Sequence, residues 1–267
     1  LREQYDNSVS HALEYYIADF ALSRFADALG KKKDAEMFYK RSLGYKHYYS
    51  KEFGTFRPIL PDGTFYSPFN PRQGENFEPN PGFHEGNSWN YTCYVPHDVY
   101  GLAKLMGGKK PFIDKLQMVF DEGLYDPANE PDIAYAHLFS YFKGEEWRTQ
   151  KETQRLLDKY FTTKPDGIPG NDDTGTMSSW AIFNMIGFYP DCPGLPEYTL
   201  TTPVFNKVTI RLDTKWYKEN ELVIETNRTQ PGTLYIDKVL LDGKKFNKYH
   251  ITHDELVHGK YLKFDLK

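Results

Sequence analysis

The sequence predicts a mainly helical protein that ends in a small antiparallel β module. Apolar residues recur at helical spacing through residues 1–190. After Pro190, short β-like runs alternate with turns. One long loop and several short turns separate the helices, an alternation typical of the paired helices of an α/α toroid. We therefore predict residues 1–190 as the helical part that carries the functional motifs, and residues 191–267 as a β-rich module.

The helices follow from apolar periodicity and from the residues that interrupt it. Residues 8–29 carry Val9, Leu13 and Ile17 at helical spacing, and Gly30 supplies a stop. Pro96 must kink or restart its helix, because proline lacks a backbone N–H. The expected helices span 8–29, 32–49, 88–106, 111–122, 131–143, 145–161 and 174–188, with a long irregular stretch at 51–86.

The β module is predicted from short runs that are rich in β-branched and aromatic residues. Asp242-Gly243 marks a hairpin turn after one such run. The boundary with the helical part falls in residues 191–197, where proline and glycine cluster. The expected strands span 198–200, 208–212, 221–225, 239–241 and 261–264.

The composition limits the classes of function. A net charge of −4 at pH 7 gives no electrostatic reason to bind nucleic acid or an anionic membrane. No run of 18 apolar residues occurs, so we expect no membrane insertion. Cys93 and Cys192 could form a disulfide, but we favour two independent buried thiols. Because the chain starts at Leu1 without a methionine, we expect a processed or truncated piece of a longer protein.

Two acidic segments carry the functional argument: residues 84–89 (HEGNSW) and residues 170–175 (GNDDTG). Each places carboxylates beside glycines, where backbone can approach a ligand closely, and near aromatic residues that can stack on sugar rings. A glycosidase needs two such carboxylates, one to protonate the leaving oxygen and one to activate water. The structural alternatives are a Glu favoured by a helix dipole and an Asn or Asp that caps helix 174–188. Capping and catalysis can coexist in the second segment.

Longer motifs resemble the glycoside hydrolase family 92 exo-α-mannosidases. They lie at residues 84–108, 128–142, 147–150 (WRTQ) and 165–210, in the order of that family. The resemblance implies a calcium-dependent, inverting mannosidase with an (α/α)6 barrel and a separate N-terminal β-sandwich. It covers only the last part of the family's catalytic region. The chain departs from the family pattern at residues 17–20 and at Cys93, where an aromatic residue is common.

The resemblance strengthens the catalytic roles expected for these segments. Glu85 is the expected general acid, because nearby aromatic residues can dehydrate its surroundings and raise its pKa. These residues are Trp89, Tyr91 and Tyr94.

Asp173 is the general base, oriented by Asp172 and Asn171, although the choice between Asp172 and Asp173 is left open. For an inverting enzyme we expect the two carboxyl groups roughly 6.5–9.5 Å apart.

The resemblance also assigns a metal site. Asn129, Glu130 and Asp173 are the expected ligands of Ca²⁺, which prefers carboxylate and carbonyl oxygens. In mannose, O2 and O3 are cis and can chelate such an ion. The alternative for Asn129 and Glu130 is a helix start with proline in the first turn.

Four residues are candidates for substrate contacts: Trp89, His97, Asp98 and Glu130. His97 and Asp98 would hydrogen-bond the sugar or support Glu85. The alternative for His97 is a satisfied structural histidine in an aromatic region.

These assignments predict a calcium-dependent, inverting exo-α-mannosidase that removes terminal mannose through an α-1,2 or related linkage. A non-catalytic carbohydrate-binding or scaffold fragment is the alternative. An α/α-barrel enzyme for another sugar is disfavoured by the combination of residues 128–131 (ANEP) and 170–173 (GNDD). The expected partner is a mannose-containing oligosaccharide or glycoprotein glycan, not nucleic acid. A missing N-terminal domain or a second copy would cover the open barrel face. The resemblance implies an extracytoplasmic location.

Overall fold

The computed structural model describes residues 7–74, 82–230 and 232–267, which fall into two compact units. One unit contains Leu1–Tyr135 with Cys192–Leu195, and the other contains Ala136–Asp191 with Pro196–Lys267. The change from helix to strand, predicted within residues 191–197, occurs earlier in the structure, where α8 ends at Ile186 and strand β3 begins at Phe188. The assignment of residues 1–190 and 191–267 as functional domains stays a prediction.

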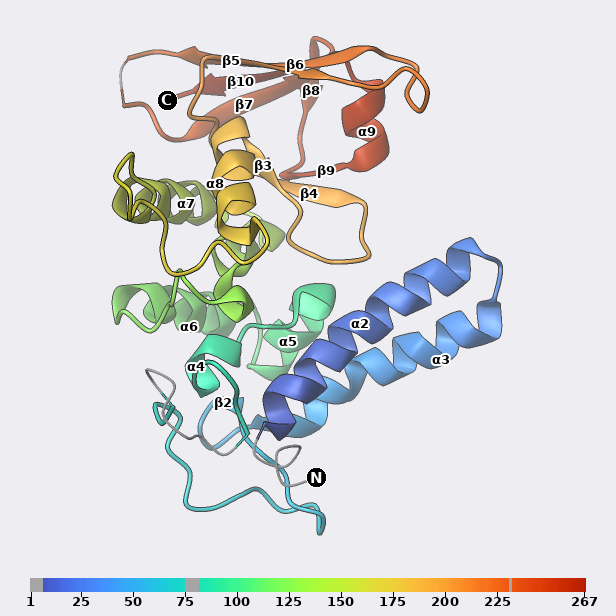
Figure 1. The fold of residues 1–267 in the computed structure, drawn as a ribbon, viewed down its shortest axis with the longest axis vertical. Coiled ribbons are helices and arrows are strands. Elements are labelled where there is room, and N and C mark those ends of the chain that lie inside the picture. Colours follow the sequence, from blue (N-terminus) through green and yellow to red (C-terminus); the bar gives the residue numbers. More distant parts are fainter. Residues whose placement is uncertain (1–6, 75–81, 231) are drawn as a thin grey trace. The chain divides into compact units, whose positions relative to one another are not determined.

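The first unit is built from helices and one two-stranded ribbon (Figure 1). Its elements are α2 (Ser8–Ala28), α3 (Lys32–Ser42), the 3-10 helix η1 (Leu43–Tyr48), β1 (Tyr49–Ser50), β2 (Thr55–Phe56), α4 (Ser88–Tyr91), η3 (Pro96–Asp98), α5 (Val99–Leu105), α6 (Lys109–Asp121) and η4 (Glu130–Asp132). The helix predicted at 88–106 therefore restarts at Pro96, as expected.

Helices α2 and α3 form a hairpin (Figure 1), and ion pairs join them, Lys32 with Asp27 and Arg41 with Asp19. Nε and Nη2 of Arg41 donate to the two carboxylate oxygens of Asp19 at 2.6 and 2.5 Å. The Asp19 side chain is only 4% exposed. A buried carboxylate needs such a two-pronged partner, because an unpaired charge in the interior costs several kcal/mol.

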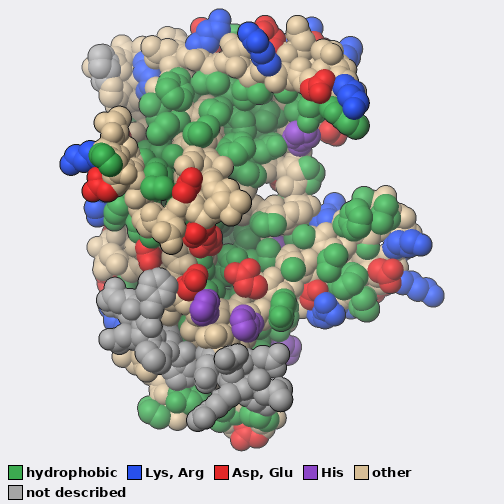
Figure 2. All heavy atoms as spheres, in the orientation of Figure 1, with side chains coloured by type: hydrophobic (Ala, Val, Ile, Leu, Met, Phe, Trp, Pro, Cys, Tyr) green, Lys and Arg blue, Asp and Glu red, His purple; other side chains and the backbone are tan. Residues whose placement is uncertain are grey.

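The hairpin also exposes apolar side chains. Figure 2 shows hydrophobic side chains along its surface and Lys and Arg side chains at its end. The large exposed ones are Tyr15, Leu22, Phe25, Leu29, Met37 and Tyr39. Contiguous apolar surface on a protein is typical of an interaction face.

The second unit combines helices with two sheets. Its elements are η5 (Tyr135–Tyr141), α7 (Glu146–Tyr160), α8 (Thr176–Ile186), β3 (Phe188–Tyr189), β4 (Glu197–Leu200), β5 (Lys207–Arg211), β6 (Glu221–Arg228), β7 (Ile236–Leu241), β8 (Lys244–Phe246), β9 (His250–Thr252), α9 (His253–His258) and β10 (Tyr261–Leu266). The strand orders are β5-β6-β10-β7-β8 and β3-β4-β9.

The larger sheet is mixed, which corrects the prediction of an antiparallel module. Strand β10 pairs antiparallel with β7 but parallel with β6, where Leu262 lies opposite Ile224. A parallel pair needs a long connection, and the chain from β7 through α9 supplies one. Leu262, Phe264 and Leu266 of β10 are buried on one face, as strand alternation requires.

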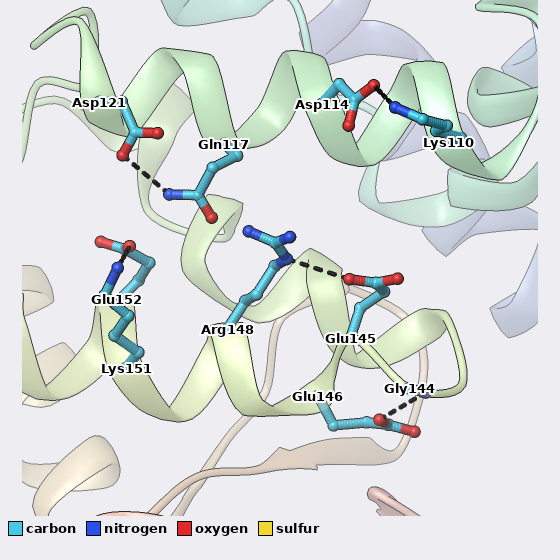
Figure 3. A network of polar contacts seen from close by, with 10 residues as sticks. All are labelled: Lys110, Asp114, Gln117, Asp121, Gly144, Glu145, Glu146, Arg148, Lys151 and Glu152. Atoms are coloured by element: carbon cyan, nitrogen blue, oxygen red, sulfur yellow. Dashed lines mark hydrogen bonds and ion pairs between the residues drawn. The ribbon is translucent and has the colours of Figure 1, made fainter.

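Charged side chains form ion pairs with near neighbours in the sequence along α6 and at the start of α7 (Figure 3). On α6, Lys110 pairs with Asp114 at 2.5 Å. On α7, Nε of Arg148 lies 3.0 Å from the Glu145 carboxylate. Such pairs add only about 0.3–0.5 kcal/mol each, so packing holds these helices in place.

Three further predictions differ from the structure for local reasons. The helix predicted at 32–49 tightens into η1 after Ser42, where a Cβ on Gly44 would lie 2.6 Å from the Tyr16 ring. The segment 131–143 forms 3-10 turns instead of an α-helix. Helix α9 was not predicted, although Thr252 and Glu255 form a capping box at its start.

Within the described residues, no helix is both long and apolar enough to span a bilayer. Cys93 and Cys192 are both free and buried. The favoured prediction of two buried thiols is therefore confirmed.

The buried carboxyl of Asp191 should make stability depend on pH. Burial raises its pKa from 3.8 to about 6, although the Thr199 hydroxyl donates to it at 3.0 Å. In the unfolded chain this carboxyl group releases its proton near pH 3.8. Its contribution to the free energy of unfolding is therefore complete below pH 3.8 and is lost as the pH rises through about 6. The loss is about 3 kcal/mol, at about 1.4 kcal/mol per pKa unit.

The Asp191→Asn variant should lack this loss. Urea unfolding of wild type and variant between pH 4 and pH 7 measures the difference, and the exposed Asp166→Asn variant is the control. Parallel pH profiles for wild type and Asp191→Asn would contradict the assignment.

Candidate functional site

The segment that carries Glu85 forms an unusual turn at the start of α4. Glu85 has a φ of 57°, in the left-handed region that non-glycine residues rarely adopt, and Gly86 follows at 147°. A Cβ on Gly86 would lie 2.7 Å from Oδ1 of Asn90, so only glycine fits there. The Glu85 side chain is 48% exposed, and Nε2 of His84 lies 3.4 Å from its Oε1. The turn therefore presents this carboxylate at the surface.

Several side chains hold the backbone of this turn. Nδ2 of Asn129 donates to the carbonyl oxygen of Glu85, and the Tyr91 hydroxyl donates to that of His84 at 2.7 Å. Asn87 and Asn90 form a reciprocal capping box at the start of α4. Glu85 and Asn129, both predicted site residues, thus meet across 44 positions of sequence.

A buried carboxylate lies behind the turn. Oδ2 of Asp132 accepts from Nδ2 of Asn90 at 3.1 Å and from the backbone N–H of Asp126 at 2.6 Å. Full burial raises the pKa of Asp132 well above its usual value. Asp132 was not predicted as a site residue, and its signal in the sequence was its place directly after Asn129-Glu130-Pro131.

A second missed carboxylate, Glu14 on α2, lies near the same turn. The Tyr94 hydroxyl donates to its Oε1 at 2.9 Å. Burial raises the pKa of Tyr94, and the negative charges of Glu14 and Glu130 raise it further. Burial also raises the pKa of Tyr91, and the negative charges of Glu14 and Glu85 raise it further. The charges of Glu85 and Glu130 thus act on one pair of tyrosines in contact, Tyr91 and Tyr94.

The predicted substrate residue Trp89 lies in α4, two residues after the cap. Nζ of Lys115 lies 4.9 Å from the Trp89 ring centroid. Burial lowers the pKa of Lys115. Lysine and ring thus form a cation–π pair. A contact between Trp89 and a sugar stays a prediction.

His97 and Asp98 make the contacts expected of structural residues. Nε2 of His97 lies 3.0 Å from the carbonyl oxygen of Ser42, and its ring packs against Phe20 and Tyr45. Burial lowers the pKa of His97. Asp98 caps α5, accepting from the Gly101 N–H at 3.0 Å and from the Tyr45 hydroxyl at 2.8 Å. A direct contact of either residue with sugar stays a prediction.

The second acidic segment precedes α8 in the second unit. Asp173, Thr174 and Gly175 are consecutive left-handed residues with φ of 42°, 62° and 89°. Oδ1 of Asp172 accepts from the Ser178 N–H at 2.8 Å, so Asp172 satisfies a donor in the first turn of α8. Asn171 and Asp173 are exposed. Asp172 thus has the helix-capping role that was the structural alternative to catalysis for this segment. Asp173 presents its carboxylate to solvent.

The donors proposed for calcium are of the right chemical type. Asn129 points its amide nitrogen at Glu85, so its carbonyl oxygen is the end that can bind a cation. Glu130 follows it and adds carboxylate oxygens, which Ca²⁺ prefers. Within the described residues, no three His, Cys, Asp or Glu side chains are grouped to hold a metal. The separation of Glu85 from Asp173, which lies in the other unit, stays a prediction.

Comparison with known proteins gives one consistent result. Residues 1–267 match the sequence model of the glycosyl hydrolase family 92 catalytic domain. A GH92 α-mannosidase structure from Bacteroides thetaiotaomicron has a TM-score of 0.88 and 32% identity, covering 97% of this chain and 34% of its own. An inverting GH92 mannosidase of the same bacterium has a TM-score of 0.86 and 31% identity, covering 97% of this chain and 37% of its own.

A curated relative, an uncharacterized secreted glycosidase of Arthroderma benhamiae, is 25% identical over 97% of this chain and 35% of its own. The chain thus spans about a third of the length of the relatives that it matches.

The two aspartates before α8 should differ in their effect on stability. Asp172→Ala removes the acceptor for the Ser178 N–H and should cost about 1 kcal/mol, whereas Asp172→Asn keeps an acceptor oxygen. Asp173→Asn should change stability by less than about 0.5 kcal/mol, because the side chain is exposed and Asn tolerates a left-handed backbone. Chemical denaturation of the three variants measures this, and an equal loss in Asp172→Ala and Asp173→Asn would refute the capping role.

Proposed function

Because the chain belongs to glycosyl hydrolase family 92, we propose that it carries out calcium-dependent, inverting exo-α-mannosidase chemistry. The proposed substrate is a terminal mannose of an oligosaccharide or glycoprotein glycan, in an α-1,2 or related linkage. One observation carries the proposal: Glu85 is held in a left-handed turn by Asn129, with its carboxylate exposed. Such strain persists only where surrounding contacts enforce it, and it is common at active sites.

Glu85 is the proposed general acid, which protonates the leaving oxygen. Asp173 is the proposed general base, which activates water on the opposite face of the sugar. The cap made by Asp172 favours this choice, because a carboxylate that serves a helix N–H is less available as a base. Asp172 and Asn171 would then orient Asp173. The inverting relative supports inversion here.

Asn129, Glu130 and Asp173 are the proposed calcium ligands. A bound Ca²⁺ would polarise and orient the O2 and O3 hydroxyls of mannose. The hydrogen bond from Asn129 to Glu85 would couple the metal-binding amide to the position of the acid. Trp89, His97, Asp98 and Glu130 remain the proposed residues for contact with substrate.

The proposed architecture extends beyond the observed elements. We propose that the helices form part of an (α/α)6 barrel, and that an N-terminal domain or a second copy covers the open barrel face. The secreted relative supports an extracytoplasmic location. Since the chain spans about a third of its relatives, a non-catalytic sugar-binding fragment is the second candidate.

Loss of either carboxylate should abolish hydrolysis of an aryl α-mannoside. We expect Glu85→Gln and Asp173→Asn to lower kcat by about 10²- to 10⁴-fold, the usual contribution of a positioned acid or base. Glu36→Gln, an exposed change on α3, is the matched control. NMR of the first product should show β-mannose. Wild-type binding without turnover would favour the sugar-binding alternative, and an α-anomer would contradict inversion.

Removal of calcium should abolish activity and leave the fold intact. EGTA should reduce aryl α-mannoside hydrolysis to background, and added Ca²⁺ should restore it. Elemental analysis and far-UV circular dichroism accompany the assay, with Asn129→Ala as the variant expected to need more Ca²⁺. Full activity in EGTA, with no metal bound, refutes the proposed cofactor.

A further inference from the structure

A cavity of about 440 Å³ lies in the second unit, lined by residues of α7 and β7 and by Lys267, which follows β10. Three aromatic residues, Trp147, Tyr235 and Tyr249, line it together with the polar residues Glu146, Gln150 and Lys267. Trp147 and Gln150 come from the WRTQ motif, to which the proposed catalysis gives no role. We propose that this cavity binds one hexopyranose ring of a glycan, through residues other than those assigned to catalysis.

The aromatic wall is exposed yet fixed. Trp147 is 40% exposed. The Arg148 guanidinium lies 4.6 Å from its ring centroid, and the Tyr235 ring lies 6.5 Å away at 71°. An exposed ring that is held in this way loses little conformational entropy on binding and offers an apolar face. The C–H face of a pyranose is a suitable partner for it.

The remaining walls are tied together before any ligand arrives. The buried Gln150 of α7 accepts the Ile236 N–H of β7 at 3.0 Å, and it also hydrogen-bonds Tyr249. The backbones of Tyr235 and Lys267 exchange two hydrogen bonds, at 2.8 and 3.0 Å. A site whose walls are already fixed needs no costly reorganisation on binding.

The charges in the wall favour a neutral, hydroxyl-rich ligand. Oε2 of Glu146 accepts the Gly144 N–H at 2.7 Å (Figure 3), and a carboxylate has further lone pairs for a sugar hydroxyl. Nζ of Lys267 is 2.9 Å from Asp237, which offsets its positive charge. A carboxylate beside an offset cation disfavours an anion. The volume of about 440 Å³ falls within the range of small-ligand sites, which suits one sugar unit.

The test compares two exposed tryptophans of the same unit in the full-length protein. Trp147→Ala removes the platform, Trp147→Phe keeps a ring, and Trp216→Ala is the control, since Trp216 is 73% exposed and lies outside the cavity. Each change is made in the Glu85→Gln background, and binding to yeast mannan is measured by affinity electrophoresis. We expect about tenfold weaker retention for Trp147→Ala and unchanged retention for Trp216→Ala. Equal losses in both, or none in Trp147→Ala, overturn the proposal.

A second measurement needs no destabilising change. The protein is labelled with 5-fluorotryptophan, and the Trp147 resonance is assigned by its absence in Trp147→Phe. Methyl α-mannoside, methyl α-glucoside or methyl β-galactoside should shift this resonance with saturation, while inorganic phosphate should not. The proposal is overturned if no sugar moves it, or if phosphate moves it as strongly.

The proposal that the cavity binds a hexopyranose rests on the cavity alone. The choice of mannan as the first ligand to test rests on the proposed function. Aryl α-mannoside hydrolysis separates the two ideas, and Trp147→Ala with Glu85 intact should hydrolyse it at the wild-type rate. Sugar binding at Trp147 without hydrolysis by wild type would reject the proposed function alone. Hydrolysis without sugar binding at Trp147 would reject this site alone.

Discussion

The hydrogen bond from the Asn129 side chain to the Glu85 carbonyl is the constraint on which the first acidic segment depends. A left-handed conformation at a non-glycine residue costs about 1–3 kcal/mol, so it must be imposed from outside the turn. Tyr91 fixes the preceding carbonyl, and Asn90 is in turn anchored by the buried Asp132. The direction of one exposed carboxylate therefore rests on residues 126–132, far along the chain.

Burial separates three carboxyl groups that serve the fold from the two that are proposed for catalysis. Asp19, Asp132 and Asp191 are buried, and each has an Arg, Asn, N–H or hydroxyl donor as its partner. Glu85 and Asp173 are exposed, each with a left-handed backbone. A buried carboxyl group uses its oxygens to accept hydrogen bonds from neighbouring donors, whereas an exposed one keeps its oxygens available for a ligand. The proposed catalytic pair belongs to the exposed group.

The sequence was sufficient for features that local rules control. Periodicity located α2, α6 and α7, Pro96 marked the restart before α5, and Asp242-Gly243 marked the turn between β7 and β8. Residues 84–89 and 170–175 stood out because carboxylates lie beside glycines there. Local rules cannot predict which residues far apart in the sequence contact one another in the fold. The parallel pairing of β10 with β6, the contact of Asn129 with Glu85 and the support from Asp132 and Glu14 all join distant segments.

The central place of β10 in the larger sheet has a consequence for biosynthesis. Strands β6 and β7 are hydrogen-bonded to β10 and not to each other, yet β10 is the last of the three to leave the ribosome. Until it arrives, two strands with apolar faces have unpaired edges, which invite pairing with other chains. The decisive step in folding of this sheet therefore waits for β10, and a nascent chain that stalls before Tyr261 leaves these edges open to chaperones or to aggregation.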